Sequence, residues 1–220
     1  MRPLIAVPII AERTFLATAK AQEAMKRGAN LIEYRIDRMK KVTLEKLISQ
    51  EISCIITNRH PKEDKDSPGY YCENARLSSL KEAARCGANY IDIESKFLKE
   101  DFLKYINRDK TKVIVSYHNF DETPPLEELE KTCNQIISQG ADILKIATMV
   151  NEEDDVRKIT DLRKYIKIPA IIIGMGEKGK LTRVAPDNYL TFGALSKDEG
   201  SAPGQYTIEE LVEYFKQNSN

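Results

Sequence analysis

Lys145 stands at a position where a lysine has no evident structural use. It interrupts the apolar segment 142–148, which is too short for an amphipathic helix and predicts a buried strand. Removing an ammonium group from water is unfavourable unless the group is paired or loses its proton. Lys145 is therefore expected either to pair with a carboxylate or to act as a nucleophilic amine, the form that makes Schiff bases with carbonyl substrates. The alternative is a lysine that reaches out of a strand end or pairs for structural reasons alone.

Further polar side chains share one face of the neighbouring predicted strands. Because side chains alternate along a strand, Glu33 and Arg35 lie opposite Ile32 and Tyr34. The same pattern places these residues on the polar face: Thr57, Arg59, Asp92, Glu94, Ser116, His118 and Lys145. Faces toward helices must be apolar, so this set should point inward. Each residue alone could be structural, as part of an ion-pair ladder, a core histidine or a solvated arginine. Their convergence from separate strands predicts a functional site.

A repeated tripeptide indicates which elements position these residues. Gly28-Ala29-Asn30, Gly87-Ala88-Asn89 and Gly140-Ala141-Asp142 each end a helical pattern and precede an apolar strand. The predicted strands are Leu4–Ile10, Leu31–Asp37, Cys54–Arg59, Tyr90–Glu94, Lys112–His118, Ile143–Thr148, Ala170–Met175 and Tyr189–Leu195. Helices are predicted over 16–27, 43–50, 77–86, 97–106, 125–138, 152–165 and 207–217.

Eight strands that alternate with helices predict a parallel sheet covered by helices. No Pro/Gly/Ser-rich linker divides the 220 residues, so we expect one α/β domain, a single (β/α)8 TIM barrel over residues 1–220. An open doubly wound sheet is the alternative. The last crossover is the least regular, because residues 177–186 hold only a short helix that ends at Pro186.

A glycine motif could suggest a nucleotide site. Residues 174–179 read G-x-G-x-x-G after a predicted strand, and Asp198 follows about twenty residues later. A dinucleotide site needs a full helix after the glycines and an acid at the end of the next strand. Here Pro186 shortens the helix, so we expect no nicotinamide or flavin cofactor. The glycines should instead allow a tight turn or a close approach of the loop.

The composition excludes several partners and cofactors. The 34 basic and 34 acidic residues give a formal net charge of zero, which argues against nucleic acid and membrane surfaces as partners. No apolar stretch has membrane length, and the N-terminus has no room for a signal peptide. Cys54, Cys72, Cys86 and Cys133 are scattered and predict reduced thiols in a cytoplasmic protein, with neither a zinc site nor a disulfide framework.

The inward-facing residues together resemble the type I 3-dehydroquinate dehydratases, the Schiff-base enzymes of the shikimate pathway. The resemblance rests on these segments in this order: Glu33-Tyr34-Arg35-Ile36-Asp37, Arg59, Ser116-Tyr117-His118, Asp142–Ala147 with Lys145, Thr182-Arg183, and Ser201–Gln205. It spans the chain from the first strand to the last loop. It implies a (β/α)8 barrel that is a homodimer and that needs no metal or cofactor.

The resemblance also implies a role for each residue. Lys145 would form the imine with the substrate ketone, and His118 would move the protons. Glu33 would orient the histidine and help to bind substrate. The substrate contacts implied for the remaining residues are Arg35 and Arg59 at the ring hydroxyls, Arg183 at the carboxylate, and Ser201 and Gln205 from a loop that closes over the substrate.

Two other functions remain possible from the sequence. A class I aldolase on the same barrel would also use a strand lysine, although Arg183 and His118 favour a carboxylate substrate and a dehydration. A catalytically silent barrel would tolerate loss of Lys145 or His118, and both are present. The chain departs from the family pattern in two places. The first strand offers no hydroxyl to a ligand, and an N-terminal hairpin of longer relatives is not expected. The sequence therefore does not predict how the bottom of the barrel is closed.

Overall fold

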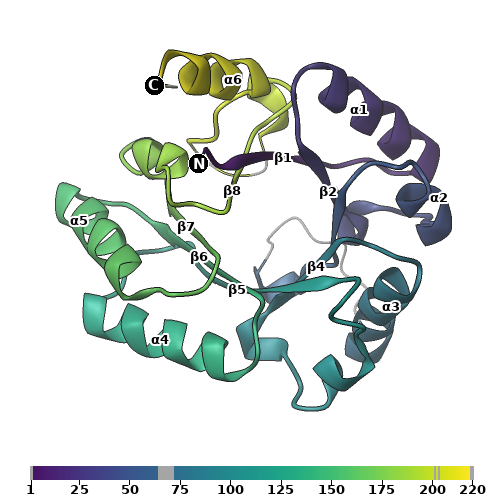
Figure 1. Ribbon diagram of the computed structural model, residues 1–220, viewed down its shortest axis with the longest axis horizontal. Helices are drawn as coiled ribbons and strands as arrows, with labels where there is room; N and C mark the ends of the chain where they lie inside the picture. Colours follow the sequence, from purple (N-terminus) through teal and green to yellow (C-terminus); the bar gives the residue numbers. More distant parts are fainter. Residues whose placement is uncertain (1, 64–71, 201, 203, 219–220) are drawn as a thin grey trace.

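The computed structural model describes residues 2–63, 72–200, 202 and 204–218. Its eight strands are β1 (Leu4–Ile9), β2 (Leu31–Arg35), β3 (Cys54–Thr57), β4 (Tyr90–Glu94), β5 (Lys112–Asn119), β6 (Ile143–Met149), β7 (Ala170–Met175) and β8 (Leu190–Phe192). The α-helices are α1 (Thr14–Lys26), α2 (Leu44–Ile48), α3 (Glu73–Arg85), α4 (Leu126–Ser138), α5 (Glu153–Leu162) and α6 (Ile208–Gln217). Figure 1 shows the strands as an inner ring with the helices around it.

All strand pairs are parallel and follow the chain in the order β7-β6-β5-β4-β3-β2-β1-β8. Between β7 and β8, the Tyr189 amide donates to the Ala170 carbonyl at 2.7 Å, which brings the two ends of the sheet together. The predicted single (β/α)8 barrel is therefore confirmed, and the open doubly wound sheet is excluded. Within the described part of the chain, no helix is long and apolar enough to cross a membrane.

The repeated tripeptide ends helices as predicted and also joins strands. Gly28, Gly87 and Gly140 have φ values of +112°, +95° and +89°, which glycine adopts without steric cost. The side-chain oxygen of the residue two positions after each glycine accepts a hydrogen bond from a backbone N–H near the start of the strand that precedes the helix. The bonds run from Ile5 N to Asn30, from Cys54 N to Asn89, and from Val113 N to Asp142, at 2.7–2.9 Å.

A fourth bond of this kind, from Ile172 N to Asn188 at 2.9 Å, completes the series without the glycine. Asn188 follows the shortened crossover, where Lys180–Val184 form a 3₁₀ turn in place of an α-helix. The same strand-pair device therefore occurs four times around the ring, and only three copies carry the repeated tripeptide.

The strand faces separate two hydrophobic cores. The larger core lies between strands and helices and includes Ile32, Tyr34 and Ile56. The smaller core fills the barrel interior and includes Leu31, Ile55 and the residues Ala6, Ile114, Ile143, Ile171, Ile173, Leu190 and Phe192. At its lower end the hydroxyls of Tyr90 and Tyr189 meet at 2.8 Å, so side chains close the bottom of the barrel.

The helix predicted over 97–106 is wrong. The structure has two 3₁₀ turns there, Ser95–Phe97 and Phe102–Tyr105. Phe97 stacks on His60 with the ring centroids 3.6 Å apart, and Phe102 is buried. The apolar spacing that suggested a helix is thus met by two short turns, of which the second buries Phe102 and the first leaves Phe97 partly buried against His60.

Candidate active site

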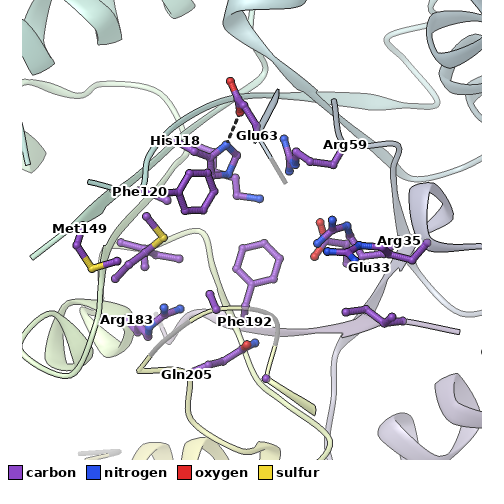
Figure 2. Close-up of a pocket in the computed structure, with 18 of the residues that line it drawn as sticks. Glu33, Arg35, Arg59, Glu63, His118, Phe120, Met149, Arg183, Phe192 and Gln205 are labelled. Atoms are coloured by element: carbon purple, nitrogen blue, oxygen red, sulfur yellow. Dashed lines mark hydrogen bonds and ion pairs between the residues drawn. The ribbon is translucent and has the colours of Figure 1, made fainter. Parts of the chain in front are cut away.

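A cavity of about 560 Å³ opens at the carboxyl ends of the strands, where barrel enzymes place their sites. Seven of the residues predicted for the site line it, and they come from six different strands and connections: Glu33, Arg35, Arg59, His118, Lys145, Arg183 and Gln205. Figure 2 shows most of these side chains pointing into one space. Ser201, also predicted for the site, lies outside the described residues.

Lys145 is held inside the barrel by a carboxylate and an aromatic ring. Its side chain is 7% exposed, and Nζ lies 2.7 Å from Oδ2 of Asp92. Nζ also sits over the Phe192 ring, 4.6 Å from the centroid. Of the two states expected for a buried lysine, the structure shows the carboxylate pair. Lys145 and Phe192 both line the cavity, so the amine remains accessible from it.

Asp92 is tied to two further groups besides Lys145. Ser116 Oγ donates to Oδ1 at 2.7 Å, and Arg59 Nη1 lies 3.1 Å from the same oxygen. Burial opposes ionisation of this carboxyl, but Arg59 and Lys145 outweigh burial and hold its pKa well below its ordinary value. Asp92 is therefore ionised at neutral pH and places a negative charge beside the amine.

His118 pairs with Glu63, a residue that the sequence analysis did not select. Nδ1 of His118 lies 3.0 Å from Oε2 of Glu63, which ends the 3₁₀ turn Pro61–Glu63 after β3 (Figure 2). Glu33 instead accepts from the Thr57 hydroxyl at 2.7 Å. The prediction that Glu33 orients the histidine is therefore wrong, because Thr57 on the adjacent strand takes its carboxylate while the β3 loop brings Glu63 to the ring.

The His118–Glu63 pair is arranged to hold a proton near neutral pH. Burial raises the pKa of Glu63 to about 7. Burial, together with the positive charges of Arg59 and Lys145, holds the pKa of His118 well below its ordinary value. The imidazole is therefore neutral at physiological pH, the form that can accept a proton.

Cations outnumber carboxylates around the cavity. Among the described lining residues, two are acidic, Glu33 and Glu63, and six are basic: Arg35, Arg38, Arg59, Lys62, Lys145 and Arg183. Arg183 is 2% exposed, and burial lowers the pKa of its guanidinium to about 10. Two nitrogens of Arg35 bind Asp37 at 2.8 and 3.0 Å, which fixes its orientation. The excess of positive charge suits an anionic substrate.

The glycine motif serves close packing, as expected. A Cβ on Gly179 would lie 2.5 Å from the carbonyl carbon of Gly174, so the two glycines let the loop fold back on the end of β7. Gly204 has a φ of +71° and packs so closely on the carbonyl of Gly176 that a side chain there would collide with it. The loop that carries Gln205 thus rests against the loop after β7.

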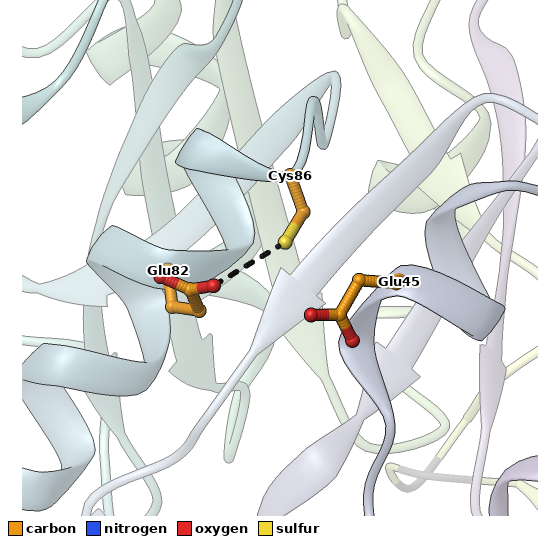
Figure 3. Close-up of side chains that lie close together, drawn as sticks. All are labelled: Glu45, Glu82 and Cys86. Atoms are coloured by element: carbon orange, nitrogen blue, oxygen red, sulfur yellow. Dashed lines mark hydrogen bonds between the residues drawn. The ribbon is translucent and has the colours of Figure 1, made fainter.

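A separate group of possible metal ligands lies outside the barrel. Glu45 of α2 approaches Glu82 and Cys86 of the α3 region, as Figure 3 shows. Burial and the charges of Glu82 and Glu45 raise the pKa of the Cys86 thiol, so it stays protonated and is a poor metal ligand. Arg85 binds Glu82 as an ion pair. We therefore interpret Glu45, Glu82 and Cys86 as a packing contact between α2 and α3.

The structure is a (β/α)8 barrel with a buried lysine and a histidine–glutamate pair in one cavity at the carboxyl ends of its strands. Residues 5–220 match the family model of type I 3-dehydroquinase. The chain belongs to the type I 3-dehydroquinase family, as its resemblance predicted. A 3-dehydroquinate dehydratase of Methanococcus maripaludis strain C7 is 36% identical over 220 residues, covering 97% of this chain and 99% of that protein.

Two solved structures support the same assignment. The type I 3-dehydroquinate dehydratase of Clostridium difficile, determined with covalently modified comenic acid, has a TM-score of 0.86 and is 27% identical. The comparison covers 98% of this chain and 92% of that one. The 3-dehydroquinate dehydratase of Aquifex aeolicus has a TM-score of 0.81, is 29% identical and covers 99% of both chains.

Proposed function

We propose that the protein dehydrates 3-dehydroquinate to 3-dehydroshikimate through a Schiff base on Lys145. The observation that carries the proposal is a buried amine and a neutral histidine lining one cation-rich cavity in a chain of this family. The expected reaction requires an electron sink, because a proton next to a ketone is weakly acidic and hydroxide is a poor leaving group. A protonated imine provides that sink.

The first half of the reaction uses Lys145 and Asp92. The amine loses a proton and attacks the ketone carbon to give a carbinolamine. The two protons that the nitrogen gives up end on the former ketone oxygen, which leaves as water, and the C–N bond becomes an iminium ion. Asp92 lies within hydrogen-bond distance of the nitrogen at 2.7 Å, and its negative charge at neutral pH stabilises the iminium.

The second half uses His118. The neutral imidazole accepts the proton from the carbon next to the iminium, which gives an enamine. The enamine expels the β-hydroxyl as the same imidazolium protonates it, and hydrolysis of the conjugated imine releases the product. A contact from Nδ1 to Glu63 fixes the ring and stabilises the imidazolium that forms between the two steps.

The remaining residues are assigned to substrate binding. Arg183 is placed at the substrate carboxylate, since a guanidinium can bind two oxygens at once and a buried cation gains most from an anion. Glu33, Arg35 and Arg59 are assigned to the ring hydroxyls, and Ser201 and Gln205 to the covering loop. No metal or cofactor enters this mechanism.

A spectrophotometric assay with 3-dehydroquinate tests the proposal. The conjugated enone of the product absorbs in the ultraviolet and the substrate does not, so turnover appears as a rise in absorbance. Sugar phosphates that a class I aldolase would cleave serve as controls and should give no product. Turnover of those sugars with none of 3-dehydroquinate would assign the site to an aldolase.

Gln205→Ala should raise KM by about 3- to 10-fold and lower kcat by less, as expected when a ground-state contact is lost. Gln205 lines the cavity from the loop that rests on the turn after β7. Steady-state kinetics with 3-dehydroquinate provide the measurement. A variant that loses kcat at unchanged KM would assign Gln205 to the chemical steps.

The kcat/KM of the wild-type protein should fall as the pH drops through about 7. Glu63 has a raised pKa of about 7, so it takes up a proton below this pH and no longer accepts from His118. The lowered pKa of His118 keeps the histidine neutral over the same range, so its own protonation does not explain the loss. Glu63→Gln should be slower at neutral pH and should lack this acid limb. If Glu63→Gln shows the same acid limb as the wild-type protein, the carboxyl of Glu63 is not the group that causes it.

We further propose a cytoplasmic homodimer without a nucleic-acid partner. Four free cysteines suit a reducing compartment, and the formal net charge of zero argues against nucleic acid as a partner. Size-exclusion chromatography with light scattering would measure the mass directly. A mass near the 25.1 kDa of one chain at micromolar concentration would exclude a stable dimer.

A further inference from the structure

A row of buried charges leads from a surface helix to the amine of Lys145. Helix α3 lies outside the barrel in Figure 1, yet its Arg76 is 4% exposed and reaches the strand ends. Arg76 Nη1 lies 2.7 Å from Oε2 of Glu94 and also donates to the Asn58 carbonyl at 2.9 Å. At its other edge Arg76 Nε binds Glu73 at 2.9 Å.

The row continues inward without a gap. Oε1 of Glu94 accepts from Arg59 Nη1 at 3.1 Å, and Arg59 Nη1 lies 3.1 Å from Asp92. Asp92 in turn binds Lys145. The charges alternate in sign along the whole row: Glu73, Arg76, Glu94, Arg59, Asp92 and Lys145.

The inner members of the row are held from several sides. Glu94 is fully buried, and its Oε1 also accepts the backbone N–H of His60 at 2.9 Å, so both carboxylate oxygens are in use. Ser116 Oγ accepts from Arg59 at 3.0 Å while donating to Asp92. Removing one buried charge leaves its neighbour uncompensated, so the row should respond along its length.

We propose that Arg76 is a positioning residue for Lys145, and that it acts through Glu94, Arg59 and Asp92. Arg76 fixes one oxygen of Glu94, which leaves the other oxygen to hold Arg59 against Asp92. Asp92 is then held at the distance that orients the amine. The inference rests on the proposed function, in which Lys145 is the nucleophile. It assigns a part in the reaction to a helix residue that does not line the cavity.

The charge balance of the row makes the test specific. Asp92 on β4 is the direct partner of Lys145. The titratable and charged groups that line the cavity together with Lys145 are Glu33 and Arg35 on β2, Arg38 after β2, Arg59, Lys62 and Glu63 after β3, His118 on β5, and Arg183 after β7. Removing the positive charge of Arg76 leaves the row net negative, which favours a cation at its inner end. Removing the negative charge of Glu94 does the opposite.

The experiment measures the rate of borohydride trapping of the substrate adduct against pH, together with kcat and KM, in the full-length protein. Arg76→Met should lower the trapping rate and kcat at neutral pH by about 3- to 10-fold. It should also move the midpoint of the acid limb of the trapping rate, which depends on the Lys145 amine, to higher pH, and this limb is read separately from the kcat/KM limb assigned to Glu63. Glu94→Gln should move that midpoint to lower pH. The double variant Arg76→Met/Glu94→Gln should return it toward the wild-type position.

Arg85→Met is the matched control, since Arg85 lies on the same helix but pairs with Glu82 on the surface. It should leave the profile unchanged. Arg76→Lys replaces Arg76→Met if that variant does not fold. It keeps the positive charge but cannot contact Glu94 and Glu73 at the same time. It should therefore keep the wild-type midpoint of the pH profile and show a lower trapping rate. Circular dichroism and thermal melting report folding for every variant.

The outcomes separate this inference from the proposed function. If the wild-type protein is not trapped on Lys145, the proposed function fails. If the wild-type protein is trapped but Arg76→Met and Glu94→Gln shift the midpoint in the same direction, or not at all, Arg76 has a structural role only and the inference is overturned.

Discussion

Lys145→Ala is expected to abolish turnover of 3-dehydroquinate and to remove the site of covalent labelling. Borohydride added with substrate to the wild-type protein should reduce the imine, inactivate the enzyme and add mass at one position. Peptide mass spectrometry should place the adduct on Lys145. The reason is geometric, since the Lys145 amine is held between Asp92 and the Phe192 ring at the floor of the cavity.

The alanine variant should still fold. Asp92 keeps Arg59 and Ser116 as partners when the amine is gone, so the carboxylate is not left without compensation. Lys62→Ala is the control, because Lys62 is the other lysine among the described residues that line the cavity. It should remain labelled on Lys145. Full activity in Lys145→Ala, or an adduct on another lysine, would overturn the imine mechanism.

The fold could be predicted because its signals are local. Strand alternation, apolar helix faces and the glycine at each helix end act over a few residues, and all eight strands were located from them. The 97–106 segment failed because the same apolar spacing satisfies two 3₁₀ turns. Asn188 was missed as the fourth copy of the strand-pair bond because no glycine marks it.

Strand periodicity predicted the part of the site that lies on strands, and the family resemblance added Arg183 and Gln205, which lie outside them. Lys145, His118 and Asp92 lie on regular strands, so their direction follows from alternation. Glu63 and Arg76 do not lie on strands. The first is placed by a turn after β3, and the second reaches inward from a helix. Which acid meets His118 therefore depends on a loop conformation that no period encodes, and this is why Glu33 was chosen in place of Glu63.

His118→Ala should lower kcat by at least about 10²- to 10⁴-fold, the range for loss of a general acid–base group, because one residue serves both proton transfers. The side chain lines the cavity and is oriented by Glu63. Imine formation should survive, since the amine and its Asp92 partner are intact. Borohydride with substrate should then still label Lys145 in a protein that hardly turns over.

The second histidine of the chain offers a matched control for this result. His60 stacks on Phe97, and it is not among the residues that line the cavity. His60→Gln should therefore cost far less than His118→Ala, below about 10-fold in kcat, since no proton transfer is lost. Both variants are measured in the ultraviolet assay at saturating substrate, with the labelling experiment run in parallel. A variant His118→Ala that keeps more than about a tenth of the wild-type kcat has lost less than about 10-fold, whereas the smallest loss expected for a general acid–base group is about 10²-fold. That result would show that another residue moves the protons. The neutral imidazole beside Glu63 would then serve binding alone.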